Sequence, residues 1–307
     1  MGQLHPRNAH IGRYDIPLLC KSNPELSSFV TKNPSGEETI DFAQPAAVLA
    51  LNKALLTQFY DVKEWAIPDG FLCPPVPGRA DYIHYAADLL ANSNAGKIPI
   101  GKKVKVLDIG TGANVIYPII GSQTYGWQFV GTELADAAFE SAFINVESNA
   151  NLKAKVQLRK QPDPNKIFAN IVKPKDKFAL SICNPPFHAS AADASASSTR
   201  KNRNLHSGKP QGNSPLNFGG QQSELWCDGG EVGFINRMIN ESETYKNNIC
   251  WFSCLVSKRE NLDVIQRFLK KKPVKQIEIV QMSQGQKVSR FVAWTYQSKE
   301  KQLAWFN

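Results

Sequence analysis

The 307-residue chain is 42% hydrophobic, so it can bury one large core or a core with an appendage. Its 36 basic and 27 acidic residues leave a net charge of +9, which favours a polyanionic partner such as a nucleic acid. The apolar runs are too short for a membrane span or a signal peptide, so we expect a cytoplasmic protein. The six cysteines form no CxxC pair, so we predict no zinc module, no other metal site and no disulfide framework.

Two regions differ in their pattern of predicted elements. Residues 1–75 carry several prolines and one clear helix pattern, at 45–61, so we predict an N-terminal extension. The second region, 76–307, begins with an amphipathic helix pattern at 77–93. From residue 103 onward, apolar β-like runs alternate with helix patterns, which indicates a mostly parallel α/β sheet.

Seven strands are predicted in this second region, with three helices between them. The strand patterns lie at 104–110, 127–133, 155–160, 178–184, 248–256, 275–281 and 291–297. The helix patterns lie at 113–123, 134–150 and 258–272. The segment MSQGQKVSR between the last two strands has no room for a crossover helix. We therefore expect the last strand to pair antiparallel, which closes a Rossmann-like sheet.

A glycine loop follows the first predicted strand, in the sequence VLDIGTGAN. Asp108 is followed by Gly110 and Gly112, and only glycine lets the backbone turn this tightly and a ligand approach closely. Val115 stands where a dinucleotide fingerprint would carry a third glycine, so the loop fits S-adenosylmethionine better than NAD. Glu133 ends the second strand, where a carboxylate can accept ribose hydroxyls; an acid favoured by the dipole of the next helix is the alternative.

The fourth predicted strand ends in Asn184, Pro185, Pro186 and Phe187. Ligands of such sheets bind at the carboxyl ends of the strands, so this turn should face the glycine loop. The Asn184 side-chain oxygen and the Pro185 carbonyl can accept the two hydrogens of an exocyclic amine, and Phe187 can stack on its ring. This chemistry fits methyl transfer to a planar nitrogen. It leaves open adenine N6, guanine N2, cytosine N4 and a glutamine amide.

Several motifs together resemble one known family along nearly the whole chain. They are HPRN at 5–8, PPVPGRADYIH at 74–84, the glycine loop, CNPPFH and LNFGGQQSELWCDGGE at 216–231. In these motifs the chain closely resembles the bacterial 23S rRNA (adenine-1618-N6)-methyltransferases. It is also similar to the catalytic domain of eukaryotic N6-adenosine methyltransferases that act on a small nuclear RNA. The resemblance implies a Rossmann-like class I S-adenosylmethionine-dependent fold and methyl transfer to N6 of adenine 1618 of 23S rRNA.

The resemblance also implies roles for individual residues. It implies cofactor contacts at Arg79, Gly110, Asn114 and Glu133, and the adenine pocket at 184–187. Asp108, Gly112 and Asn184 complete the predicted set of cofactor-binding residues. At position 114 the eukaryotic relatives have a smaller hydroxyl residue. Arg79 begins a predicted helix, where pairing with a carboxylate is the alternative to a cofactor contact. The implied partner is 23S rRNA or a large-subunit assembly intermediate, and we expect a monomer.

The basic candidates for RNA contact lie at the N-terminus and in a long polar loop, 188–224. They are Arg7, Arg13, Arg200, Lys201 and Arg203, with His5 and His10 as further N-terminal candidates. Lys270, Lys271 and Lys272 end a predicted helix, where the helix dipole and solvation explain them. The loop is followed by glycines around Trp226, which suggest a lid over cofactor or RNA, although these residues could equally make structural contacts.

Three other functions remain as alternatives. A guanine-N2 rRNA methyltransferase can use the same turn after the fourth strand. A non-catalytic RNA-binding or assembly factor would be expected to lack the glycine loop, Glu133 or Asn184, and all of these are present. Protein glutamine methylation fits the basic charge balance less well.

Overall fold

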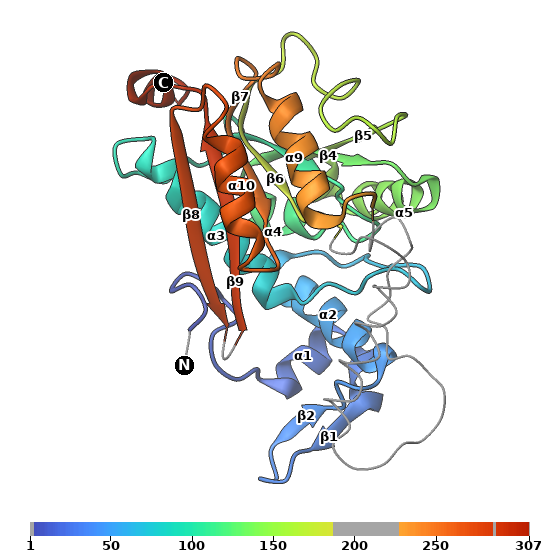
Figure 1. Ribbon diagram of the computed structural model, residues 1–307. Coiled ribbons are helices and arrows are strands. Elements are labelled where there is room, and N and C mark those ends of the chain that lie inside the picture. The colour runs from blue at the N-terminus through green and yellow to red at the C-terminus, as the bar shows by residue number, and fades with distance from the viewer. Residues whose placement is uncertain (1–2, 187–226, 285–286, 307) are drawn as a thin grey trace.

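The computed structural model describes residues 3–186, 227–284 and 287–306, and its centre is a seven-stranded sheet (Figure 1). The strand order is β5-β4-β3-β6-β7-β9-β8, and β9 is the antiparallel strand among otherwise parallel neighbours. The strands are β3 (Lys105–Ile109), β4 (Gln128–Glu133), β5 (Val156–Lys160), β6 (Phe178–Cys183), β7 (Ile249–Leu255), β8 (Gln276–Gln284) and β9 (Lys287–Thr295). The predicted strands and the antiparallel closure are confirmed.

The closing hairpin is longer than the sequence pattern predicted. Residues 282–290 were expected to connect the two strands, but pairing continues to Gln284 opposite Lys287. A hairpin needs only about two residues in its turn, so a polar segment can stay in the ladder. Met282 is buried within this continuation, and β8 packs against the helix α3 (Val76–Asn92).

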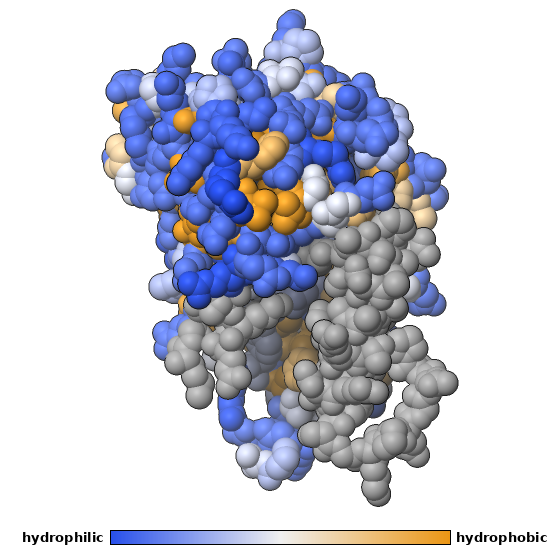
Figure 2. All heavy atoms as spheres, viewed as in Figure 1, coloured by the Kyte–Doolittle hydropathy of each residue, from blue (hydrophilic) through white to orange (hydrophobic). Residues whose placement is uncertain are grey.

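Helices cover both faces of the sheet. Together with α3, the helices α4 (Ile116–Thr124) and α5 (Asp136–Glu147) contribute to one hydrophobic cluster, and α9 (Gly230–Ser242) and α10 (Asn261–Leu269) contribute to the other. The short helices α6 (Ala150–Lys153) and α11 (Lys299–Ala304) complete this region. Figure 2 shows hydrophilic side chains over most of the side bearing α9 and α10, around a hydrophobic patch near its middle. In the described ranges, no helix combines the length and the apolar character needed to cross a bilayer.

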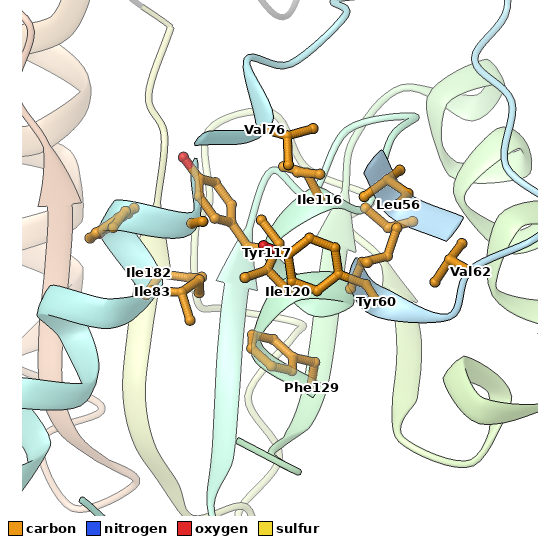
Figure 3. Packing of buried hydrophobic residues seen from close by; sticks show 14 of the residues in the cluster. Leu56, Tyr60, Val62, Val76, Ile83, Ile116, Tyr117, Ile120, Phe129 and Ile182 are labelled. Carbon is orange, nitrogen blue, oxygen red and sulfur yellow. The ribbon is translucent and has the colours of Figure 1, made fainter. Parts of the chain in front are cut away.

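The N-terminal segment is built into the same core. It contains α1 (Ile16–Ser22), the 3-10 helix η1 (Pro24–Phe29), a hairpin of β1 (Val30–Lys32) and β2 (Glu38–Ile40), and α2 (Pro45–Tyr60). Figure 3 shows Leu56 and Tyr60 of α2 packed with Ile116 and Ile120 of α4. Because a contiguous cluster of buried side chains marks one core, the N-terminal helices α1 and α2 share the hydrophobic core of the sheet.

Candidate active site

The glycine loop and the Asn-Pro-Pro turn meet at the carboxyl edge of the sheet. β3 and β6 are neighbours, and Ile109 is paired with Cys183. The next residue of each strand, Gly110 and Asn184, therefore lies at the same level. The chain proceeds from β3 to β4 on one side, while β6 lies on the other side, so this edge is the switch point where open α/β sheets bind ligands.

The glycine loop has the backbone conformation that the sequence predicted. Gly110 has φ of +68° and Gly112 has φ of +66°, values that favour glycine. A Cβ atom built at Gly110 would find no other atom within 4 Å, so the space above this residue is open to a ligand. The open space above Gly110, which we call the glycine cradle, would begin to be filled by any larger residue at this position.

The Glu133 carboxylate holds the glycine loop against the start of α5. Its Oε2 accepts a hydrogen bond from the Gly112 amide at 3.0 Å, and its Oε1 accepts from the amides of Leu134 at 2.7 Å and Ala135 at 3.0 Å. A carboxylate offers about four lone-pair sites, so these three bonds leave room for another donor. The Glu133 carboxylate thus accepts hydrogen bonds from amides at the start of α5, which agrees with the alternative of an acid favoured by the helix dipole. It can still accept a hydrogen bond from a ribose hydroxyl.

Asp108 is a buried carboxyl group that lacks partners. Its side chain is fully buried, and neither carboxylate oxygen makes a hydrogen bond of ordinary geometry within the described part of the chain. Burial raises the pKa of Asp108 to about 7, and the Glu133 charge adds to the rise, while the nearby Thr111 hydroxyl and the Arg79 charge lower the pKa in part. A buried acidic group without a donor, beside an open glycine cradle, fits a ligand that carries cationic groups.

Asn184 presents a second buried acceptor without a partner. Its Oδ1 atom is buried and makes no hydrogen bond among the described residues. Leaving such an oxygen unsatisfied costs about 1–3 kcal/mol, so its persistence at a strand end indicates a missing donor. Pro185 is buried and Pro186 is partly buried. Phe187 and the neighbouring His188 lie outside the described residues.

Arg79 reaches the site from the first turns of α3. Its Nη1 donates a hydrogen bond of 2.8 Å to the hydroxyl of Tyr117, and its guanidinium carbon lies 5.6 Å from the centre of that ring. Within the described ranges Arg79 makes no salt bridge, so the carboxylate pairing considered above is not what holds it. Tyr117 was missed from the sequence, although it stands only a few residues after the glycine loop.

The Asn114 side chain is engaged in local structure. Its Oδ1 accepts from the Ile116 amide at 3.1 Å at the start of α4, and its Nδ2 donates to the Leu72 carbonyl at 3.4 Å. The Asn114 carbonyl accepts from Trp65 Nε1 at 2.9 Å. Asn114 therefore ties the N-terminal segment to the glycine loop, and a direct cofactor contact by its side chain stays a prediction.

The N-terminal basic residues are largely occupied within the protein. Arg7 donates to Asp88 Oδ1 at 2.6 Å and to the Tyr125 hydroxyl at 3.1 Å, and His5 Nε2 lies 2.8 Å from Asp88 Oδ2. His10 is buried, and burial lowers its pKa to about 4, so it is neutral near pH 7. These contacts give Arg7, His5 and His10 structural roles, and RNA contact by Arg7 stays a prediction.

Arg13 and the loop residues complete the predicted set. The Arg13 side chain is 76% exposed and forms an ion pair with Glu37. Arg200, Lys201 and Arg203 lie outside the described residues, as does the whole of the predicted loop 188–224. Within the described ranges, no group of three or more His, Cys, Asp or Glu side chains is arranged to hold a metal ion.

Comparisons with known proteins agree on one family. The sequence model of a family described as "RNA methyltransferase" matches residues 1–298. The chain is 53% identical to the ribosomal RNA large subunit methyltransferase F of Psychromonas ingrahamii, over 95% of this chain and 94% of that protein. The human METTL16 catalytic domain in complex with a MAT2A 3'UTR hairpin is 29% identical, with a TM-score of 0.79 and 96% of each chain covered. The N-terminal domain of human METTL16 in complex with SAH is 26% identical, with a TM-score of 0.74, over 96% of this chain and 99% of that one.

Proposed function

This chain belongs to the ribosomal RNA large subunit methyltransferase F family, and from that premise we propose that it methylates N6 of adenine 1618 in 23S rRNA. It is an S-adenosylmethionine-dependent methyltransferase of large-subunit ribosomal RNA. The choice of an amino group as acceptor rests on one observation, the buried and unpartnered Oδ1 of Asn184 beside the glycine cradle.

The residues around the cradle fit the cofactor. S-Adenosylmethionine supplies a methyl group on a positively charged sulfur and carries an ammonium group as well. The unpartnered Asp108 carboxyl complements this positive charge, and the remaining lone-pair site of Glu133 suits a ribose hydroxyl. Gly110 leaves the space that close approach of a ligand requires. Arg79, fixed by Tyr117, adds a cation that can bind the carboxylate of the methionine part.

The turn after β6 orients the target amine. Asn184 Oδ1 and the Pro185 carbonyl accept one hydrogen each, which favours a pyramidal nitrogen and frees its lone pair for the methyl group. Pro185 and Pro186 fix their own φ angles and have no N–H, so the turn cannot continue as a helix. Phe187 supplies a stacking face for the base. The amine loses its proton only as the methyl group arrives, so the step needs no strong base.

The proposed RNA substrate suggests where the protein acts and which of its segments bind RNA. We infer that the protein acts as a monomer on 23S rRNA or on a large-subunit assembly intermediate, in the cytoplasm, where bacterial ribosomes are built. The N-terminal segment 1–75, with the exposed Arg13, and the basic loop residues Arg200, Lys201 and Arg203 are proposed to hold RNA around the flipped adenine. The likeness to a methyltransferase domain in complex with an RNA hairpin supports this inference.

Nucleoside analysis of treated rRNA tests the proposed function. Ribosomal RNA from a strain that lacks the enzyme is incubated with the protein and labelled S-adenosylmethionine, then digested and analysed by mass spectrometry with mapping of the modified position. We expect N6-methyladenosine at position 1618. N2-methylguanosine alone would contradict the assignment, and label transferred to protein instead of RNA would indicate glutamine methylation.

A further inference from the structure

Five segments gather at the amino edge of the sheet, opposite the candidate active site. They lead into β3, β6, β7 and β8 or follow β9, and in Figure 1 they lie at the upper end, near the C-terminus. We call them the amino-edge lysine surface, which comprises residues 93–105, 171–177, 243–248, 270–275 and 296–306. The strands separate this surface from the active site by roughly 20 Å, given about 3.3 Å per residue.

Hydrogen bonds join these segments into one continuous surface. Gln302 is buried at the centre, where its Oε1 accepts from Ser93 Oγ at 2.8 Å and its Nε2 donates to Gln276 Oε1 at 3.3 Å. Gln297 donates its side-chain amide to the Lys246 carbonyl. Asn248 Nδ2 donates to the Asp176 carbonyl at 2.9 Å. The lysines of this surface therefore stand on a fixed scaffold.

The positive charge of the chain is concentrated on this surface. Its segments contain fourteen lysines and three acidic residues, a net charge of +11, whereas the whole chain carries only +9. Thirteen of these lysines are exposed. Of the three acidic residues, Asp176 is paired with Arg159 and Glu243 lies 3.5 Å from Lys272. Figure 2 shows mostly hydrophilic side chains along this upper edge.

Solvation and helix dipoles explain only part of this arrangement. Lys270, Lys271 and Lys272 follow the end of α10, where cations are favoured. No helix end explains the lysines that precede or begin β3, at positions 102, 103 and 105, or those that precede β6, at positions 173, 175 and 177. These segments contain no arginine. The arginine guanidinium can form two parallel hydrogen bonds to a base edge, whereas the lysine ammonium contacts phosphate as a point charge, so a lysine-only surface favours backbone contact over base reading. The pattern fits contact with a polyanionic backbone.

A hollow of about 400 Å³ lies within this surface. Its lining includes Lys177, Lys301 and Trp305, and Lys177 Nζ lies 5.1 Å from the centre of the Trp305 ring. Cations beside an aromatic ring are the combination that binds single-stranded nucleic acid, because the ring stacks on a base and the cations hold its phosphates. Trp305 is partly buried, so one end of the ring is held by the protein.

We propose that the amino-edge lysine surface is a second RNA-binding surface, which holds phosphates of the same large-subunit rRNA far from the methylated adenine, with the Trp305 hollow receiving an unpaired nucleotide. The inference rests on the proposed function, because it takes rRNA as the substrate. A folded rRNA extends well beyond one nucleotide, so contacts at both edges of the sheet would orient the protein on its substrate and raise affinity without reading sequence.

Charge reversal with a matched control tests this proposal. The test variant is Lys173→Glu, Lys175→Glu and Lys301→Glu. The control is Lys153→Glu, Lys166→Glu and Lys258→Glu, which changes three exposed lysines outside both the N-terminal segment and the amino-edge lysine surface by the same total charge. Binding to a 23S rRNA transcript and to a short fragment centred on the target adenine is measured at several salt concentrations. Binding of S-adenosylmethionine is measured alongside, as a check that the active site is intact.

The test variant should bind the long transcript at least about tenfold more weakly, and the slope of log affinity against log salt should fall by about 2–3. Its affinities for the short fragment and for S-adenosylmethionine should stay unchanged. Equal losses in test and control variants, or no loss in either, would overturn the proposal.

Trp305→Ala should also weaken binding of the long transcript, whereas Trp305→Phe should retain it, and equal binding by both would remove the hollow from the proposal. The binding experiment does not depend on methyl transfer. A failure of the proposed function would instead appear in the nucleoside analysis, as a methylated nucleoside other than N6-methyladenosine.

Discussion

Replacement of Asp108 by asparagine gives a pH-dependent stability effect whose size follows from the structure. The fully buried carboxyl has its pKa raised from 3.8 to about 7, mainly by burial. A folded-state pKa above the unfolded value means that folding favours the protonated acid. The stability contributed by this group is therefore full below pH 3.8 and is lost as the pH rises through 7, where the total loss reaches about 4 kcal/mol.

The asparagine variant keeps the shape of the side chain but cannot ionise. Between pH 5 and pH 8 the wild type should lose about 3 kcal/mol of unfolding free energy through Asp108, and Asp108→Asn should lack this loss. Urea unfolding of both proteins without cofactor, at pH 5 and at pH 8, measures the difference directly. If the gap between the two proteins is the same at both pH values, Asp108 is not held protonated and the account of its burial is wrong. Calorimetry should also show weaker S-adenosylmethionine binding by the variant at pH 8, because the neutral amide cannot pair with a cation.

Three further changes probe the cradle, the core and the N-terminal segment. Glu133→Gln replaces one acceptor by a donor, so at least one amide among its three partners loses its bond, and S-adenosylmethionine affinity measured by calorimetry should fall at least about tenfold. Gly121→Ala would place a Cβ atom 2.4 Å from Phe129 Cζ, so the urea midpoint should drop by the equivalent of about 1–3 kcal/mol, and an unchanged midpoint would mean that the ring moves freely. Arg7→Met should lower the free energy of unfolding by about 1–3 kcal/mol through its lost bonds to Asp88 and Tyr125, and an unchanged urea midpoint would mean that these bonds do not stabilise the fold. Weaker RNA binding by the folded variant would support the predicted RNA contact of Arg7, and unchanged binding would contradict it.

The sheet was predictable because each strand and its following turn carry a local signal. Apolar runs marked the seven strands, and glycine or proline marked where two of them end at the site. The helix α9 was missed even though Ile235, Met238 and Ile239 are spaced for one buried face. Its glycine-rich start resembles a hinge, and that interpretation hid the helical spacing.

Contacts between distant parts of the chain were not predictable from local patterns. Arg7 and Asp88 lie 81 residues apart, so the sequence alone showed Arg7 as a free basic residue near the N-terminus. The partnerless state of Asp108 and Asn184 also depends on burial by remote elements, which no motif records. Likewise, the amino-edge lysine surface exists only because five separate segments meet at one edge of the sheet.

The central claim is that the Asn184 amide orients the target amine, and single-turnover methylation with position mapping tests it most directly. Wild type and Asn184→Ala are compared on 23S rRNA from a strain lacking the enzyme, at saturating S-adenosylmethionine. Loss of one oriented acceptor should slow formation of N6-methyladenosine at position 1618 by about 100-fold or more, with RNA affinity nearly unchanged. Equal rates for the two proteins would contradict the role of the turn after β6.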